Sequence, residues 1–314
     1  MKSLSKLRRA ERGARILMYH RVADTPFDPW KLSVSPRRFD EHMAVVKNTL
    51  IPMSLAEMLR RMDENALPPN AVAITFDDGY SDNLIHAKPI LEKHGVPATV
   101  FVASGYIGGG REFWWDELDR ILSRSAKLPD TFDMEINGAR SNIAVSGSRK
   151  GRMRAYFSLW ERLHPLPEDE RNAALARLRE WAGDDGKPRS SHRPMTSDEL
   201  KNLVEGGLIE VGGHTATHPA LSGLSRAEQR EEIRAGKRGV ERAVGRSVAS
   251  FSYPHGSFSS ETVEEVEGAG FEVACSTVPE VVKDTSRPFE LPRVMATEMG
   301  GKVFGVWLSR LIGA

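Results

Sequence analysis

Short apolar runs separated by amphipathic segments recur along most of the chain. The runs at 15–20, 71–76 and 97–102 are largely apolar and do not alternate with polar residues, which is typical of strands buried on both faces. A segment with helical character at 82–94, closed by Gly95, joins the last two runs through short links. This succession of strand, helix and strand predicts a parallel sheet of α/β architecture.

The same rhythm continues on both sides of an irregular middle. Helices are expected at 35–50 and after Ser54, with Ser35 and Ser54 as N-caps and Glu57 completing a capping box. After residue 195, strands and helices are again expected in alternation, followed by an amphipathic end that packs on the body. The expected strands are 208–212, 249–253, 271–277 and 291–294, the expected helices are 196–205, 225–244 and 261–269, and the amphipathic end is 303–313.

Residues 108–195 break this regularity. They contain an expected helix, a small polar hairpin or loop, and a helical stretch interrupted by two prolines, at 114–123, 130–148 and 151–181. We interpret 108–195 as a mainly helical insertion into one domain that runs from 15 to 314, not as a separate domain. No internal repeat accompanies it.

Composition and charge exclude several classes of function. The 314 residues carry 44 Lys and Arg against 43 Asp and Glu, so no global field favours nucleic acid or anionic membranes. No run reaches the roughly 18 apolar residues of a membrane span. No apolar signal-peptide core precedes Arg15, so we expect a cytoplasmic protein. The pattern does not indicate an oligomeric state.

Two smaller features complete this picture. Residues 1–14 are expected to form a basic, solvent-exposed leader, and the cluster extends to Arg15. Its members are Lys2, Lys6, Arg8, Arg9, Arg12 and Arg15. The single cysteine, Cys275, excludes an internal disulfide and is expected to be a buried, inert thiol.

Two adjacent acids follow the strand at 71–76. Asp77 and Asp78 stand where a parallel strand would end, and neighbouring carboxylates repel one another unless a cation is close. A metal ion supplies such a cation, and Asp oxygens are competent ligands for it. One acid can then bind the metal while the other remains free as a base.

A histidine pair follows the strand expected at 208–212. His214 and His218 are four residues apart, a spacing that lets two imidazoles share one ion. Together with Asp78 they make the set of three protein ligands and one open position that is typical of a catalytic metal. A zincin peptidase would need Glu after the first histidine, but Thr215 occupies that position. The base must therefore come from elsewhere, and Asp77 is available.

These motifs together resemble the polysaccharide deacetylase family, also called carbohydrate esterase family 4 or the NodB-homology domain. The similarity rests on four segments in order along residues 15–297, apart from the insertion. They are Ile16-Leu17-Met18-Tyr19-His20-Arg21-Val22, Thr75-Phe76-Asp77-Asp78-Gly79, His214-Thr215-Ala216-Thr217-His218 and Phe251-Ser252-Tyr253-Pro254-His255-Gly256. The resemblance implies a distorted (β/α) barrel of about seven strands and metal-dependent removal of N-acetyl groups from hexosamines.

The resemblance also implies roles for single residues. Asp77 is similar to the catalytic base and Asp78 to the metal-ligating acid, while the backbone N–H of Tyr253 would stabilise the oxyanion. The family's usual arginine in the third motif and late histidine are absent here. A branch similar to the biofilm poly-N-acetylglucosamine deacetylases takes its acid from the first strand, which implies His20 as general acid and Arg293 as the residue that orients Asp77.

Structural alternatives exist for several of these residues. Asp77 can be read as a helix N-cap, His20 and Tyr253 as core residues, and Arg293 as a structural ion-pair partner. Trp114 and Trp115 can stack on sugars or pack in a core. His255 is expected in a loop role. Four histidines that lie outside the motifs are expected not to bind metal: His86, His94, His164 and His192.

The function expected from these features is deacetylation of an N-acetylated oligosaccharide, exopolysaccharide or lipid-linked glycan, with zinc as the expected ion and other divalent metals as alternatives. Hydrolysis of another C–N bond, as by a deformylase or a cyclic amide hydrolase, is an alternative on the same fold. A non-catalytic glycan-binding relative is an alternative of a different class. The expected partner is therefore a carbohydrate.

Overall fold

The computed structural model describes residues 13–108, 110–124, 128–136 and 139–312, which fall into two compact units. The described residues of 13–24, 32–107 and 195–312 form unit 1, and those of 25–31 and 108–194 form unit 2. The basic residues at 2, 6, 8, 9 and 12 lie outside the described residues. Arg15, expected in the exposed cluster, is instead 4% exposed, and Ala14 pairs with Val282 in an antiparallel bridge.

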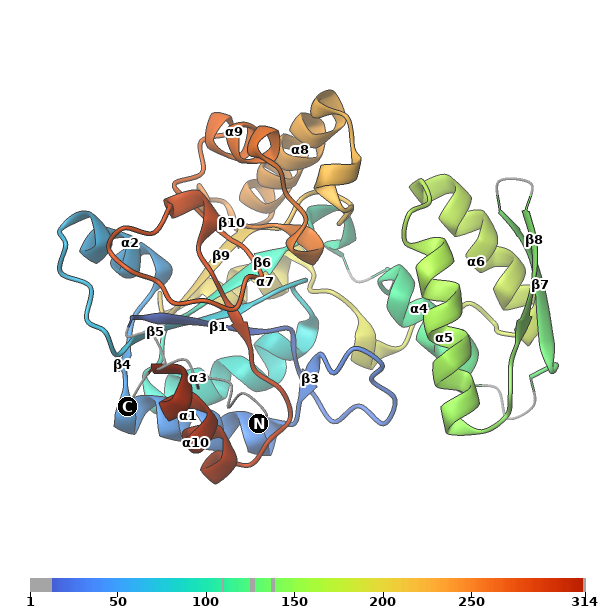
Figure 1. The fold of residues 1–314 in the computed structure, drawn as a ribbon, viewed down its shortest axis with the longest axis horizontal. Helices are drawn as coiled ribbons and strands as arrows, with labels where there is room; N and C mark the ends of the chain where they lie inside the picture. Colours follow the sequence, from blue (N-terminus) through green and yellow to red (C-terminus); the bar gives the residue numbers. More distant parts are fainter. Residues whose placement is uncertain (1–12, 109, 125–127, 137–138, 313–314) are drawn as a thin grey trace, which may run out of the picture. The chain divides into compact units, whose positions relative to one another are not determined.

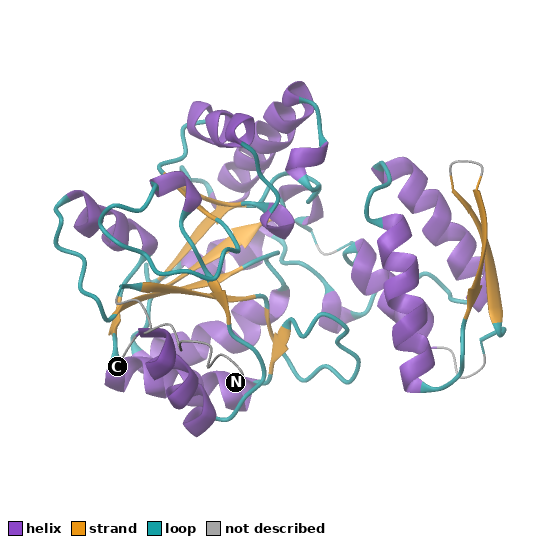
Figure 2. Ribbon diagram, viewed as in Figure 1, coloured by secondary structure: helices purple, strands orange, loops and turns teal. Residues whose placement is uncertain are grey.

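Unit 1 is built on a parallel sheet (Figures 1 and 2). Its strands run in the order β11-β10-β9-β6-β5-β1-β12, and the short β4 pairs with the start of β5. Neighbouring strands along this path pair in parallel, as expected for strands that alternate with helices. The strands are β1 (Arg15–Tyr19), β4 (Ile51–Pro52), β5 (Ala71–Phe76), β6 (Ala98–Val102), β9 (Ile209–Gly213), β10 (Ser250–Ser252), β11 (Val273–Cys275) and β12 (Val294–Met295).

The segment that leads into β12 brings the two ends of the curled sheet together. Leu291 forms a parallel bridge with Cys275 of β11, and Val294 and Met295 pair with β1. The sheet is therefore a distorted barrel of seven strands. The short β4 pairs with β5 outside this series. The strand expected at 291–294 is present as β12, but it begins at Val294, three residues later than expected.

Period-two alternation along the strands separates two cores. Ile16, Ala71 and Ala73 face the barrel interior with the methionines of α2 (Leu55–Asp63), whereas Leu17 and Val72 face the outer helices. Cys275 is fully buried in the interior core, and burial raises the pKa of its thiol to about 12, as expected for an inert cysteine.

Helices cover the outside of the sheet, and most begin at side-chain caps. Ser35, Thr196 and Ser225 each accept a hydrogen bond from a backbone N–H three residues on. Ser54 also caps its helix, but the Glu57 carboxylate binds Arg60 and Arg61, so the expected capping box is only half formed. The helices are α1 (Pro36–Thr49), α2, α3 (Lys88–His94), α7 (Ser197–Val204), α8 (Arg226–Val244), α9 (Ser260–Gly268) and α10 (Gly301–Ile312).

Several short elements escaped prediction. The expected helix 82–94 contains a π-helical turn, η1 (Asn83–Ala87), before α3. Two-residue strands and single helical turns also lie in the segments that connect the longer elements of unit 1. They are β2 (Arg21–Val22), β3 (Ser33–Val34), η2 (Ser104–Tyr106), η4 (Leu221–Gly223), η5 (Pro254–Gly256) and η6 (Pro288–Glu290).

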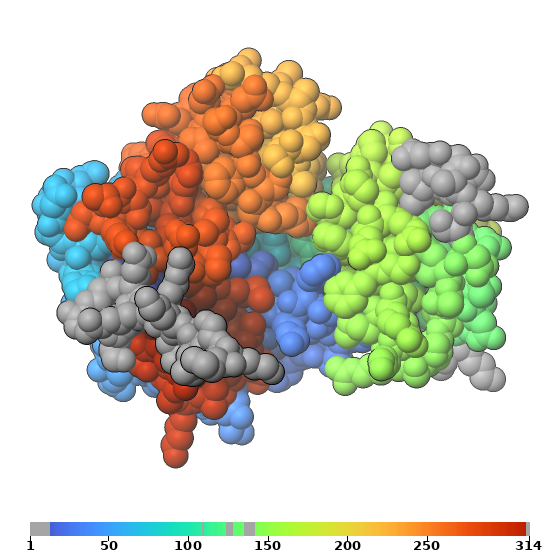
Figure 3. Space-filling model, in the orientation of Figure 1, coloured from blue at the N-terminus to red at the C-terminus, as the bar shows by residue number. Residues whose placement is uncertain are grey.

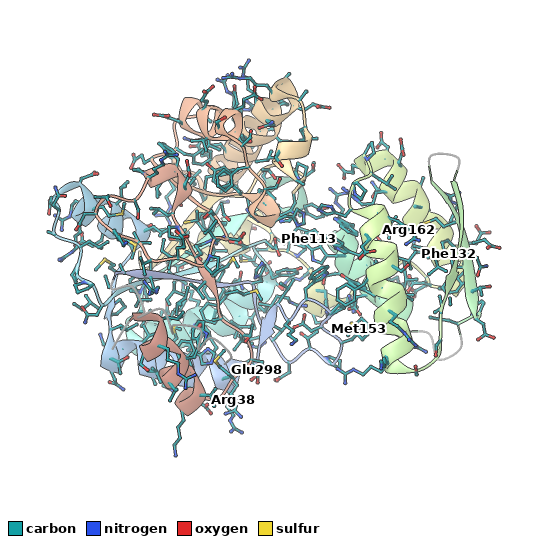
Figure 4. All side chains as sticks on the ribbon, in the orientation of Figure 1. Arg38, Phe113, Phe132, Met153, Arg162 and Glu298 are labelled. Carbon is teal, nitrogen blue, oxygen red and sulfur yellow. The ribbon has the colours of Figure 1, made fainter. Side chains whose placement is uncertain are left out.

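The outer helices are tied together by charged side chains. Helices α8 and α9 form one continuous face, gold to orange in Figure 3, where Arg226 and Arg230 both bind Glu265. Figure 4 labels Arg38 of α1 and Glu298, which precedes α10; their Nε and Oε1 atoms lie 3.8 Å apart. No helix in the described part of the chain is long and apolar enough to cross a membrane.

Unit 2 combines helices with an antiparallel hairpin. The hairpin occupies the region expected as a hairpin or loop, and two helices flank the predicted proline break. The segment 25–31 joins this unit through Trp30, whose ring packs on Phe157 and Trp160, although no sequence pattern assigned the segment to the insertion. The elements are α4 (Trp114–Arg124), β7 (Thr131–Ile136), β8 (Ala139–Ala144), α5 (Arg149–Leu163), α6 (Glu168–Ala182) and η3 (Ser190–His192).

Candidate active site

The candidate functional side chains follow the carboxyl ends of neighbouring strands. His20 follows β1, the two acids follow β5, and His214 follows β9. Because parallel strands end at the same edge of the barrel, these residues meet there although they are far apart in sequence. The alternation of β5 also places Asp77 on the same face as Ala71 and Ala73, at the mouth of the interior.

Asp78, His214 and His218 form a buried triad. The Nε2 atoms of the two histidines lie 3.1 Å apart, and they lie 3.7 and 3.3 Å from Asp78 Oδ1. Ligand atoms about 2.0–2.1 Å from a tetrahedral ion are roughly 3.3–3.4 Å apart, so these separations suit a shared metal. All three residues are less than 10% exposed.

The surroundings of His214 favour the neutral tautomer whose Nε2 can bind a metal. Its Nδ1 lies 2.8 Å from the carbonyl oxygen of Ser252, a contact that requires a proton on Nδ1 and leaves Nε2 free of one. Burial lowers the pKa of His214 to about 4, partly offset by the charge of Asp77, so the ring is neutral at pH 7.

The surroundings of Asp78 favour a bound cation. Among the residues that the structure describes, its buried Oδ1 accepts no hydrogen bond. Burial raises the pKa of this carboxyl group, with the Asp77 charge adding to the rise. A divalent cation at the triad would reverse that penalty, so the donor set and its electrostatics fit a metal ion.

Arg293 holds Asp77 in a bidentate pair. Its Nη1 and Nη2 atoms lie 2.7 and 2.8 Å from the two carboxylate oxygens of Asp77. Arg293 is fully buried, and its remaining donors bind Ser252 Oγ, Thr75 Oγ1 and the Ser276 carbonyl. The guanidinium therefore lies beside Ser252, which belongs to the third motif, where the family's usual arginine is absent. In this chain Arg293, the residue before β12, supplies the guanidinium.

This pair keeps Asp77 ionised. Burial alone would raise the pKa of Asp77, but Arg293 outweighs it and holds that pKa well below its usual range. The alternative of a helix N-cap is wrong, because the following helical segment starts at Ser81, four residues later. Asp77 is thus an ionised carboxylate beside a candidate metal ligand.

His20 lies in the same electrostatic environment. Burial lowers its pKa, while the charges of Asp78 and Asp77 act in the opposite direction. Asn83 Nδ2 donates to the His20 carbonyl at 2.9 Å, and Asp82 binds both Arg21 Nε and the N–H of Val22. Asn83 and Asp82, which lie outside the four motifs, thereby hold the backbone on either side of His20.

Tyr253 does not match the role that the resemblance implied. Its N–H donates to the Cys275 carbonyl at 3.2 Å, as part of the β10–β11 ladder, and is not available to an oxyanion in this structure. Its hydroxyl donates to the Phe289 carbonyl, and the residue is fully buried. The structure therefore favours the core alternative for Tyr253.

The remaining candidates separate by burial. Trp114 and Trp115 are 4% and 6% exposed, so they pack in the core of unit 2 and do not present a face to sugars. His255, expected in a loop role, is exposed and places its ring centroid 4.6 Å from that of His218. None of the histidines expected to be non-ligands belongs to the candidate metal group found among the described residues; they are His86, His94, His164 and His192.

Backbone strain is concentrated at this site. Six described residues other than glycine have positive φ, and four of them lie at or beside the triad: Asp78, Thr215, His218 and His255. Such conformations cost of the order of 1–3 kcal/mol each and persist where the surroundings enforce them. The strained backbone of the site is therefore maintained by the residues packed around it.

A sequence profile described as polysaccharide deacetylase matches residues 64–128 and 168–274, more than half of the chain. This chain belongs to the polysaccharide deacetylase family. Membership identifies it as a hydrolase of carbon–nitrogen bonds other than peptide bonds, in a family that is generally metal-dependent, and the triad described above can hold such an ion.

Two curated relatives illustrate the similarity within the family. The putative polysaccharide deacetylase YxkH of Bacillus subtilis is 22% identical over 301 residues, which span 94% of this chain and 76% of that protein. The poly-beta-1,6-N-acetyl-D-glucosamine N-deacetylase of Staphylococcus aureus is 30% identical over 138 residues. That match spans 40% of this chain and 47% of the relative.

Solved structures share the fold. IcaB from Ammonifex degensii aligns with a TM-score of 0.62 and 18% identity, over 95% of this chain and 98% of that one. The Streptococcus pyogenes deacetylase PplD, solved in complex with acetate, aligns with a TM-score of 0.61 and 18% identity, over 92% and 95% of the two chains. The distorted barrel is therefore the fold of these deacetylases.

Proposed function

We propose that this chain is a zinc-dependent N-deacetylase that hydrolyses the N-acetyl group of N-acetylhexosamine units in a glycan. The observation that carries the proposal is the division of the acid pair. Asp78 converges with two histidines, while both carboxylate oxygens of Asp77 are bound by Arg293. One carboxylate and two imidazoles suit zinc, although other divalent ions bind such sets.

Asp77 acts as the general base in this proposal. Asp78, His214 and His218 would hold a divalent ion, whose Lewis acidity would polarise the amide carbonyl and lower the pKa of water. Asp77 removes one proton from the attacking water through a lone pair that Arg293 leaves open. The water oxygen bonds to the carbonyl carbon as Arg293 keeps the carboxylate in position.

His20 completes the reaction as the general acid. When the C–N bond breaks, the leaving amine needs a proton, which His20 donates from the side of β1. Acetate and the free amine of the hexosamine are then released. The charges of Asp78 and Asp77 act on His20, which supports its place beside the base, and they oppose only in part the burial that lowers the pKa of its imidazole.

Acetate release tests the proposal directly. We expect the zinc-loaded protein to release acetate from N-acetylglucosamine oligomers, and the names of the staphylococcal relatives support including β-1,6-linked oligomers. Lipid-linked and nucleotide-linked N-acetylhexosamines, a formamide and a cyclic amide complete the panel. Asp77→Asn is the inactive control. Turnover of the formamide or the cyclic amide without any acetate release would assign a different C–N hydrolysis to this site.

A further inference from the structure

One carboxylate of α8 holds the loop between the two histidine ligands. Glu232 Oε2 accepts the N–H groups of Ala216 and Thr217 at 3.0 and 2.9 Å, and its Oε1 accepts the Thr217 hydroxyl at 2.9 Å. Successive backbone N–H groups that point at one oxygen form a small anion-binding concavity. Glu232 therefore satisfies the central backbone donors of the loop at a single point.

The loop's carbonyl groups are bound by η2. Ser104 N–H donates to Thr215 O at 3.1 Å, and Gly105 N–H donates to Ala216 O at 2.8 Å. Thr215 Oγ1 also accepts the N–H of His218. The segment between the ligands is thus fixed by η2 and α8 together, and little of its hydrogen bonding depends on the two imidazoles.

Helical spacing brings α8 close enough for this contact. Gly236 lies four residues after Glu232, on the same face of the helix. A Cβ at Gly236 would lie 2.5 Å from the carbonyl carbon of Thr215, so only glycine permits the approach. The carboxylate and the glycine thus form one binding surface for the loop.

This support opposes strain in the loop. Thr215 and His218 both adopt φ of 63°, a conformation that is unfavourable for residues with a Cβ. Without Glu232, two backbone N–H groups would lose their acceptor, and the loop would gain by relaxing. Relaxation would move His218 relative to His214 and Asp78.

We propose that Glu232 is a positioning residue that sets the metal affinity of the site by holding His218 in place. The inference rests on the metal site of the proposed function but not on which amide is cleaved. Neighbours of this kind commonly change metal affinity by about 10–100-fold when removed.

Metal affinity tests the inference without turnover. The Zn²⁺ dissociation constant is measured by competition with a chromophoric chelator for the wild type, Glu232→Ala, Glu232→Gln and the matched control Glu231→Ala. Glu231 is the adjacent residue of α8 and forms an exposed pair with Arg238. We expect about 10–100-fold weaker binding for Glu232→Ala. We expect near wild-type values for Glu231→Ala and for Glu232→Gln, whose amide oxygen can still accept both N–H groups.

Thermal unfolding of the metal-free variants separates positioning from general stability. Weaker zinc binding by Glu232→Ala with recovery in Glu232→Gln supports the proposal. A lower melting temperature with an unchanged dissociation constant would overturn it. If Glu232→Ala does not fold, Glu232→Asp carries the test, because it retains the charge but is too short to reach the loop, and unchanged affinity there would also overturn it. Failure of the wild type to bind zinc would instead refute the proposed function.

Discussion

Arg293 and Asp77 are 216 positions apart in sequence, yet they form two parallel hydrogen bonds of 2.7 and 2.8 Å at the mouth of the barrel. Fork-to-fork pairing of this kind fixes the plane of the carboxylate as well as its charge. The proposed base is thereby oriented by a residue that lies far from it in the sequence.

Replacement of Arg293 tests this orientation. Arg293→Lys keeps a positive charge but cannot donate two parallel hydrogen bonds, so we expect kcat to fall by about 10²-fold or more. Arg293→Met leaves a buried carboxylate without its partner and should destabilise the fold by about 3–5 kcal/mol. Steady-state acetate release and denaturant unfolding measure the two effects.

The exposed Arg287 provides the matched control for both variants. Its side chain is 80% exposed and pairs with Glu290, three residues along the chain, so Arg287→Met should resemble the wild type. Near wild-type turnover of Arg293→Lys would mean that the pair serves stability and not catalysis.

His20→Ala should lower turnover far more than it affects substrate binding. Loss of a general acid commonly costs about 10²–10⁴-fold in rate, and it should appear in kcat with little change in KM. An activated aryl ester, whose leaving group needs no proton, should be hydrolysed by His20→Ala at a much smaller disadvantage. His86→Ala, at an exposed histidine, is the control. Equal losses in kcat and in binding would contradict the acid assignment.

Asp78→Asn should separate stability from function. Without a cation, burial raises the pKa of Asp78, which means that the ionised carboxylate destabilises the fold at neutral pH. The variant should therefore bind zinc much more weakly, release no acetate, and yet melt a few degrees higher than the metal-free wild type. Calorimetry of both proteins after chelation measures the difference, and a lower melting temperature of the variant would contradict the prediction.

His42 should make the fold sensitive to acid. Its Nε2 lies 2.9 Å from the Met299 carbonyl, the Tyr19 hydroxyl lies 3.2 Å from Nδ1, and its ring stacks on Phe304 of α10. These contacts suit a neutral ring, with Nε2–H as donor and Nδ1 as acceptor. Burial lowers the pKa of His42 to about 4, against about 6.5 in an unfolded chain.

The sign of the effect follows from these two pKa values. Between pH 6.5 and 4 the unfolded chain binds the proton and the folded one does not, so the contribution of His42 is complete above 6.5 and is lost as pH falls towards 4. The loss amounts to roughly 3 kcal/mol. Unfolding free energies measured across this range should show a shallower slope for His42→Gln, with His86→Gln as control; parallel curves for wild type and His42→Gln would contradict the prediction.

Local patterns in the sequence correctly predicted the strands and helix starts that are determined by residues adjacent in the sequence. Apolar runs located β1, β5 and β6, and the N-caps Ser35 and Ser225 located their helices. These signals work because burial on both faces and capping are properties of short segments. The grouping of Asp78, His214 and His218 was predicted from the spacing of the histidines and from the placement of both motifs directly after apolar strands.

Features that depend on tertiary contacts could not be derived in this way. Glu232 carries no local signal that distinguishes it from Glu231, since only the packing of α8 on the loop makes the difference. The hydrogen bond of the Tyr253 N–H could not be foreseen, because its partner, Cys275, belongs to the next strand of the sheet. The partnership of Arg293 with Asp77 came from family resemblance, and its geometry depends on how the barrel closes.

The closure of the barrel through Leu291–Met295 has a consequence for how relatives are compared. The matched family segments, 64–128 and 168–274, include the triad and Asp77 but neither His20 nor Arg293. A relative can therefore retain every residue of those segments and still lack the counterion of its base. To decide whether such a protein is a catalyst or only binds a metal, the residues that correspond to His20, after β1, and Arg293, before β12, must also be compared.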